Sequence, residues 1–163
     1  FKIFDDINEM VSAIRDKDAQ YGLARVVAGY AWAWSTRDGK ADHDIEIDGL
    51  RLTWNSVTED WVNSKNAINE VGCIHTIQGY DLNYAGVIIG PEINYYPNEK
   101  HLFVDPKKYM DVNGKRATTQ EELNLYVTNI YKTLLTRGIR GTYVYISDPE
   151  LRELFKRSII NTV

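Results

Sequence analysis

Apolar positions recur at helical spacing in three segments of the chain. These positions are Ile7, Met10, Val11 and Ile14; Leu123, Val127, Ile130, Tyr131 and Leu134; and Leu151, Leu154, Phe155 and Ile159. They predict one helix over residues 5–19, a second that begins at Thr118 or Thr119, and a third that begins at Asp148. Aspartate or threonine at the start of such a segment is typical of a residue that caps a helix.

Apolar or β-branched runs lie between these helices and predict strands. The runs cover residues 23–32, 50–54, 71–76, 87–90 and 142–146, whereas residues 35–48 predict a loop and residues 92–114 an irregular insertion or a hairpin. Strands that alternate with helices predict an α/β fold, a largely parallel sheet flanked by helices in one domain spanning 1–163. Ligands bind such sheets at the carboxyl ends of strands, so we expect residues just after Trp32, just after Thr76 and beside Arg137 to share one rim.

Composition and charge restrict the classes of function. The chain has 163 residues, a net charge of −4 and one cysteine, Cys73, which excludes an intrachain disulfide. No apolar run reaches the ~20 residues of a membrane span, so we expect a cytoplasmic protein that does not enter a membrane. The chain begins at Phe1 rather than methionine, so we expect a domain excised from a longer chain. The three histidines show no zinc spacing, and no metal site is predicted.

Two polar stretches carry the candidate chemistry. Gln78-Gly79-Tyr80-Asp81 comes just before the apolar run at 87–89, and Arg137 ends a predicted helix just before a strand. Taken alone, Asp81 fits an Asx turn as well as a ligand contact. Arg137 likewise fits either a cation at a helix end or a planar donor to a phosphate. The sequence has neither GxxxxGK[ST] nor GxGxxG, so the usual phosphate cradle is missing from this chain.

Together these stretches resemble a known family. In superfamily-one helicases, the second RecA-like domain of the P-loop NTPase type has a Gln-Gly-Leu-Glu turn before a buried strand and a helix that ends in Leu-Thr-Arg before another strand. Longer segments resemble the Schlafen group 3-like DNA/RNA helicase domain over nearly the whole chain. These segments are GYAWAW at 29–34, CIHTIQGYDLNYAGVIIG at 73–90, YKTLLTRGIRGTYVY at 131–145 and DPELRELFKR at 148–157.

The resemblance implies a role for each matching residue at a nucleotide. Arg137 matches the arginine finger that reaches the γ-phosphate, and Asp81 matches the acid that bonds the ribose. Gln78 and Gly79 would lie close to the nucleotide, and Arg140 is a further candidate contact. The chain departs from the family pattern twice: Asp81 is one carbon shorter than the usual glutamate, and Ile139 stands where a second arginine is common.

The resemblance also implies nucleic-acid contacts and partners. Thr76 is either a plain strand-end residue or a phosphate contact, Trp34 either a core residue or a stacking platform for bases, and Arg37 a phosphate contact. ATP with Mg²⁺ would be held mainly by an amino-terminal phosphate-loop domain of the same chain, and single-stranded DNA or RNA would be the second partner. The expected function is therefore the carboxy-terminal half of an ATP-dependent helicase or translocase-like NTPase, inactive alone.

Two other classes of function compete with this one. A non-catalytic module that binds nucleic acid or protein on a helicase-derived fold is the main alternative, and the acidic net charge favours a protein partner. A free-standing α/β enzyme is the third class of function, but the sequence shows no pattern of a nucleophile paired with a base. An intact phosphate loop elsewhere in the full-length gene would favour the NTPase, and a decayed one the binding module.

Overall fold

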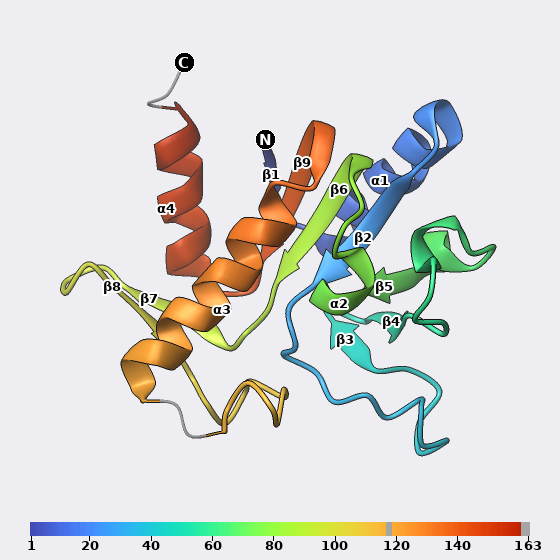
Figure 1. Cartoon of the computed structure of the whole chain (residues 1–163). Coiled ribbons are helices and arrows are strands. Elements are labelled where there is room, and N and C mark those ends of the chain that lie inside the picture. The colour runs from blue at the N-terminus through green and yellow to red at the C-terminus, as the bar shows by residue number, and fades with distance from the viewer. Residues whose placement is uncertain (117–118, 161–163) are drawn as a thin grey trace.

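Seven strands form one sheet in the order β1-β9-β6-β2-β5-β4-β3 in the computed structural model, which describes residues 1–116 and 119–160 (Figure 1). The strands are β1 (Lys2–Phe4), β2 (Ala24–Ala28), β3 (Ile45–Ile47), β4 (Leu50–Trp54), β5 (Glu70–Gly72), β6 (Leu82–Ile89) and β9 (Gly138–Ile146). β3 pairs antiparallel with β4, and the other described neighbours pair parallel. The predicted α/β fold with a largely parallel sheet is confirmed.

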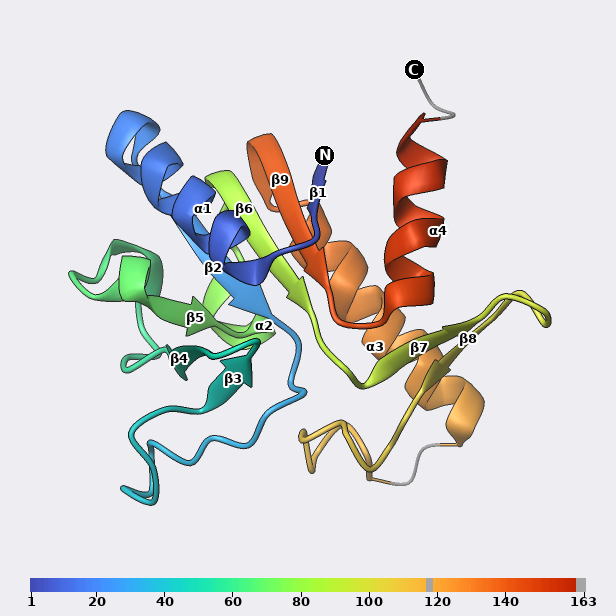
Figure 2. The same ribbon diagram turned by 180° about the vertical axis from the view of Figure 1, so that it is seen from behind.

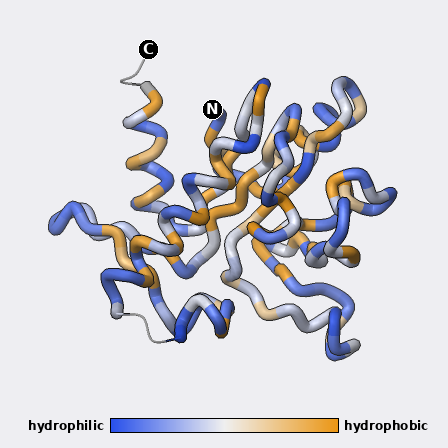
Figure 3. The backbone as a smooth tube through the Cα atoms, viewed as in Figure 1, coloured by the Kyte–Doolittle hydropathy of each residue, from blue (hydrophilic) through white to orange (hydrophobic). Residues whose placement is uncertain are grey.

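Helices cover both faces of this sheet. They are α1 (Ile7–Tyr21), α2 (Ile74–Ile77), α3 (Gln120–Leu135) and α4 (Pro149–Ile160), with two 3₁₀ turns, η1 (Trp61–Asn63) and η2 (Ala67–Asn69). α3 and α2 lie on the face seen in Figure 1, and α1 lies on the face seen in Figure 2. Each face has its own buried apolar cluster. Figure 3 shows hydrophobic segments along the central strands and mainly hydrophilic ones in the outer loops.

The three predicted helices are confirmed, together with their caps. The predicted apolar stripe of α1 is buried, and Asp6 accepts a hydrogen bond from the Asn8 backbone N–H at 2.6 Å. Thr119 and Glu122 form a capping box at the start of α3, and the alternative start at Thr118 lies outside the described residues. At α4, Asp148 Oδ1 accepts from the Leu151 N–H at 2.8 Å.

Several strand boundaries differ from the prediction. β5 ends at Gly72, and the short helix α2 replaces the predicted strand over 73–76. A side chain on Gly72 would collide with the ring of Trp61, so η1 packs directly on the end of β5. β2 ends at Ala28, and the chain then makes a tight turn in which the Ala31 N–H donates a hydrogen bond to the Gly29 carbonyl.

Two segments predicted as irregular contain short strands. The predicted loop at 35–48 includes β3, which pairs with β4. Within residues 92–114, the strands β7 (Ile93–Tyr96) and β8 (His101–Val104) form a separate two-stranded hairpin. The hairpin alternative for this region is therefore correct between Ile93 and Val104. Polar residues dominate both segments, which is why periodicity alone gives no strand signal there.

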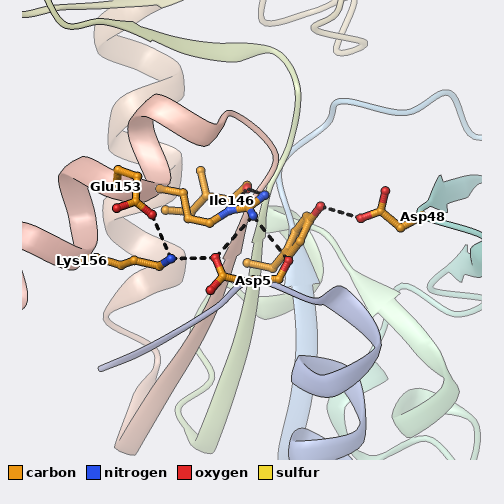
Figure 4. A network of polar contacts seen from close by, with 7 residues as sticks. Asp5, Asp48, Ile146, Glu153 and Lys156 are labelled. Atoms are coloured by element: carbon orange, nitrogen blue, oxygen red, sulfur yellow. Dashed lines mark hydrogen bonds and ion pairs between the residues drawn. The ribbon is translucent and has the colours of Figure 1, made fainter.

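A polar network attaches α4 to the first residues of the chain (Figure 4). Lys156 Nζ contacts Asp5 at 2.7 Å and Glu153 at 2.9 Å, and Arg152 donates two hydrogen bonds to the Ile146 carbonyl. Hydrogen bonding to Lys156 lowers the pKa of Asp5. The network positions α4 beside the β1–β9 edge of the sheet, at the carboxyl ends of these two strands.

Candidate functional site

The predicted site residues lie at two opposite ends of the sheet. β2, β6 and β9 run parallel, and their carboxyl ends point toward the bottom of Figure 1. Trp32 and Trp34 follow the carboxyl end of β2, whereas Asp81 and Arg137 directly precede β6 and β9 and so lie at the amino ends. The expectation of one shared rim is therefore wrong. The helix α3 carries the chain back across the sheet, so a residue between its end and the next strand must lie at the amino end.

Arg137 is held in place by the end of α3 and by the loop before β6. Its Nε donates to the Thr133 carbonyl at 3.1 Å, and its Nη1 lies 3.5 Å from the Tyr80 carbonyl. The same Nη1 lies 3.7 Å from Asp81 Oδ1, so the structure brings the predicted finger and the predicted ribose contact together. The Arg137 side chain is 25% exposed, and no described residue accepts a hydrogen bond from its Nη2. One edge of the guanidinium is thus open to a ligand.

The loop from Gln78 to Asp81 is open to solvent. Gly79 has a φ of +86°, which favours glycine, and a Cβ there would have no neighbour within 4 Å. Gln78 is exposed, and the Asp81 side chain is 66% exposed. Tyr80 anchors the loop, because its hydroxyl donates to Asp60 at 3.1 Å, which raises the pKa of Tyr80. The backbone of this loop and the Asp81 carboxylate are therefore accessible and are not enclosed by other side chains.

Arg140 lies in a second group of side chains at the same end. Its guanidinium carbon is 5.0 Å from the ring centre of Tyr21, and its Nε lies 3.4 Å from Asn83 Oδ1. Asn83 in turn donates to the Tyr21 and Gly22 carbonyls at 3.0 Å, where α1 ends. Arg140 thus fastens β9 to the end of α1. Its described partners do not include Arg137 or Asp81.

The three predicted nucleic-acid contacts do not meet Arg137. Thr76 is 4% exposed, and its hydroxyl accepts from the Cys73 N–H at 3.0 Å as part of the α2 cap. Trp34 is half-buried and packs near Tyr30 and Trp54, with ring centres 6.4 and 6.1 Å away. Arg37 is exposed and stacks over Trp34 at 5.7 Å. Trp34 and Arg37 thus form a pair of their own at the carboxyl side.

A buried acid at the carboxyl ends was not predicted from the sequence. Glu92 is fully buried, and its Oε1 accepts from the Tyr131 hydroxyl at 2.5 Å, while Gly90 N–H donates to that hydroxyl at 3.0 Å. Side chains at Gly29 or Gly90 would collide with these groups, so both glycines are required for the close approach. Burial raises the pKa of Glu92 to about 7. The available signal was an acid directly after Gly-Pro at the end of an apolar strand.

Glu92 lies near the point where the strand order reverses. From β2 the chain continues toward the side of the sheet that holds β5, β4 and β3, whereas from β6 it continues toward β9. Open α/β sheets bind ligands at such points. Here the groups are already paired inside the protein, and residues 29–34 and 105–111 cross over them, joined by the bond from Met110 N–H to the Tyr30 carbonyl. The geometry is that of a buried structural pair rather than an open ligand site.

Neither a metal cluster nor a membrane span is found over 1–116 and 119–160. Those residues contain no cluster of three or more histidine, cysteine, aspartate or glutamate side chains with the geometry of a metal site. Across the same described ranges, each helix is too short or too polar to cross a membrane. Cys73 is buried, as predicted for a core residue.

Comparisons with known proteins agree with the resemblance seen in the sequence. Residues 1–148 match the family model described as the Schlafen group 3, DNA/RNA helicase domain. The chain is 40% identical, over 96% of its length, to "Uncharacterized protein YPL245W" of Saccharomyces cerevisiae. It spans 36% of that relative's length. No solved structure matches the chain.

Proposed function

Because the chain belongs to the Schlafen group 3 DNA/RNA helicase domain family, we propose that it is the carboxy-terminal, RecA-like half of a helicase-type NTPase. In this role it offers Arg137 and Asp81 to ATP held by a phosphate-loop domain elsewhere in the same longer polypeptide. Arg137 stabilises negative charge that develops on the transferred phosphoryl group. Asp81 accepts hydrogen bonds from the ribose hydroxyls.

One observation carries this proposal. Residues from two loops far apart in the sequence place a guanidinium and a carboxylate 3.7 Å apart at the amino ends of neighbouring strands. The guanidinium is mostly buried and fixed by a backbone carbonyl, whereas the carboxylate and the Gln78–Gly79 backbone are open. A fixed cation beside an open acceptor suits a ligand that carries both phosphate and hydroxyl groups.

The residues present fit part of a nucleotide site. The open Nη2 of Arg137 and the exposed carboxylate of Asp81 supply one donor group and one acceptor group. Most phosphate affinity in P-loop enzymes comes from the glycine-rich loop, and the Mg²⁺ ion binds beside it. We therefore expect this chain alone to bind ATP weakly and to turn none over. Single-stranded DNA or RNA is the expected activator of the complete enzyme.

The test is ATP turnover by the complete gene product that contains this chain, with and without single-stranded DNA or RNA. Arg137→Ala should lower nucleic-acid-stimulated turnover by about 10³–10⁵-fold, the usual contribution of an arginine finger. Arg157→Ala, which removes an exposed arginine from α4, is the matched control and should leave turnover unchanged. Unchanged turnover in a folded Arg137→Ala variant would exclude the finger assignment.

The second candidate is a binding module that has lost catalysis. A separate groove lined by acidic and aromatic side chains favours it, because such a surface suits a protein partner. If the complete gene product folds but shows no turnover in any condition, this candidate replaces the NTPase. Both functions can also coexist, since the groove and Arg137 lie at different places on the sheet.

A further inference from the structure

A groove of about 930 Å³ lies beside β4 and β5, and Arg137 is not part of its lining. The loop after β2 forms one wall, and the segment between β4 and η1 forms the other. The charged, amide and aromatic side chains that matter for recognition are Trp34, Arg37, Asp42, Asn55, Glu59 and Glu70. The proposed nucleotide contacts do not line this groove, so it is a separate candidate site.

The charges along the groove are mainly negative. Asp42, Glu59 and Glu70 contribute three carboxylates, whereas Arg37 contributes one guanidinium. Asp42 and Glu59 are exposed at the edge of the groove, where Asp42 Oδ1 lies 2.6 Å from His43 Nδ1, whereas Glu70 is nearly buried. Like charges repel, so this surface disfavours the phosphates of a nucleic acid and favours a cation.

Two hydrogen bonds fix one carboxylate oxygen of Glu70, and the other oxygen remains available as an acceptor. The residue is 7% exposed, and its Oε2 accepts from the Ser56 N–H at 3.1 Å and from the Trp61 indole N–H at 2.8 Å. No described residue donates to Oε1. A carboxylate oxygen can accept more than one hydrogen bond, and a nearly buried one gains most from a charged donor. Glu70 therefore offers a rigid acceptor at the floor of the groove.

Asn55 supplies a second acceptor without a partner. It is 2% exposed, its Nδ2 donates to the Val57 carbonyl at 2.9 Å, and its Oδ1 has no partner within the described residues. Because a carbonyl can only accept, the bond to Val57 fixes which end of the amide is nitrogen. A buried acceptor without a donor is costly, so a ligand that donates to Asn55 would remove this cost.

The aromatic wall already holds a guanidinium. Arg37 stacks over Trp34 at 5.7 Å, and Trp34 rests against the buried ring of Trp54. Indole faces attract planar cations, and arginine does this more often than lysine. The groove thus combines an aromatic surface, two fixed acceptors and excess negative charge.

We propose that this groove binds an arginine side chain presented by a partner protein. The guanidinium lies in the groove beside the Arg37–Trp34 pair and donates to Glu70 Oε1 and Asn55 Oδ1. Its planar set of five N–H donors matches two separate acceptors better than the single ammonium of lysine. Glu59 adds long-range attraction at the open edge.

The test is a nuclear magnetic resonance titration of the full chain with the peptide N-acetyl-Gly-Arg-Gly-amide. The side-chain amide signals of Asn55 and the indole signal of Trp34 should shift in a saturable way. The same peptide with citrulline, which lacks the charge, should bind at least about tenfold more weakly, as should the lysine peptide. Glu59→Gln and Glu70→Gln should each weaken binding, whereas Glu99→Gln at the tip of the β7–β8 hairpin should not.

Three results would overturn the proposal. The first is that the folded chain shows no shift at Asn55 or Trp34 with the arginine peptide. The second is equal affinity for the arginine and citrulline peptides. The third is that single-stranded dT₁₂ shifts the same signals and binds more tightly in Glu59→Gln and Glu70→Gln, which would identify a nucleic-acid site. Arg137→Ala should leave peptide binding unchanged, so failure here and failure of the NTPase proposal can be distinguished.

Discussion

The charged groups at the two ends of the central sheet differ in how deeply they are buried. At the amino end, Asp81 is exposed and lies 3.7 Å from Arg137. At the carboxyl end, Glu92 is fully buried and has one hydrogen-bond donor among the described side chains, Tyr131. Exposed ion pairs contribute little to folding, whereas a buried carboxylate with an unpartnered oxygen costs stability. The Asp81–Arg137 pair is therefore free to serve a ligand, whereas the Glu92–Tyr131 pair is committed to the fold.

Glu92→Gln should cause the largest change in the free energy of unfolding and in its dependence on pH. Burial raises the pKa of Glu92 from its ordinary 4.5 to about 7, so the folded state holds the proton more tightly than the unfolded chain. The stability from this group is full below the unfolded pKa and is lost as the pH rises through 7. Between pH 5 and pH 8, the free energy of unfolding of the wild type should fall by about 2–3 kcal/mol relative to Glu92→Gln.

Urea unfolding at both pH values measures this difference. Glu99→Gln removes an exposed acid from a hairpin tip and should follow the wild type. If the wild type and Glu92→Gln share one pH profile, the carboxylate is not titrating in the buried site, and the contrast between the two ends loses its main support.

Tyr131→Phe should have the next largest effect. The Tyr131 hydroxyl donates to Glu92 and accepts from the Gly90 N–H, so its loss leaves two buried polar groups unpartnered. A cost of about 2 kcal/mol is expected in the free energy of unfolding. Tyr126→Phe, on the exposed face of the same helix, is the control and should change stability little. Additive effects of Tyr131→Phe and Glu92→Gln in the double variant would show that the pair does not interact.

Gly79→Ala tests the amino end and should cost less. The φ of Gly79 is +86°, and no atom lies within 4 Å of the position that an alanine Cβ would take, so the cost arises from the backbone alone. About 1 kcal/mol in the free energy of unfolding, measured by urea titration, is expected for alanine in this region. Gly79→Asn should be milder, because asparagine tolerates positive φ better. A larger loss for asparagine than for alanine would mean that the loop is more crowded than its geometry shows.

Asp81→Asn should have the smallest effect on folding. The side chain is 66% exposed, and its contact with Arg137 is long at 3.7 Å. A change below about 0.5 kcal/mol in the free energy of unfolding is expected. Thermal unfolding in low and high salt measures it. A loss as large as that of Tyr131→Phe would show that the amino end is structural after all.

The sequence is informative wherever a periodic pattern meets a capping signal. The stripe from Ile7 to Ile14, the Thr119–Glu122 box and Asp148 predict the three longer helices because each signal is local. The apolar run at 87–90 predicts only the second half of β6, which begins at Leu82. Local chemistry and long-range packing agree in these elements.

The positions of the site residues depend on topology, which a local pattern does not contain. The four-residue helix α2 is too short for helical periodicity to show, so the sequence wrongly predicts a strand through Cys73 and Thr76. Glu92, Asn55 and Glu70 escape prediction because each stands next to apolar residues that dominate its neighbourhood. The burial of these polar groups depends on how the strands pair, and local sequence does not contain that information.

The parallel pairing of β1 with β9 has a consequence for synthesis on the ribosome. Lys2 pairs with Tyr143, so the first strand made must wait for almost the last one. At roughly 5–20 residues per second, that wait is about 7–28 seconds. Until β9 emerges, β1 and the outer edge of β6 have unpaired backbone groups beside apolar side chains. During this interval the unpaired edge is a place where a growing chain can pair with another chain and aggregate.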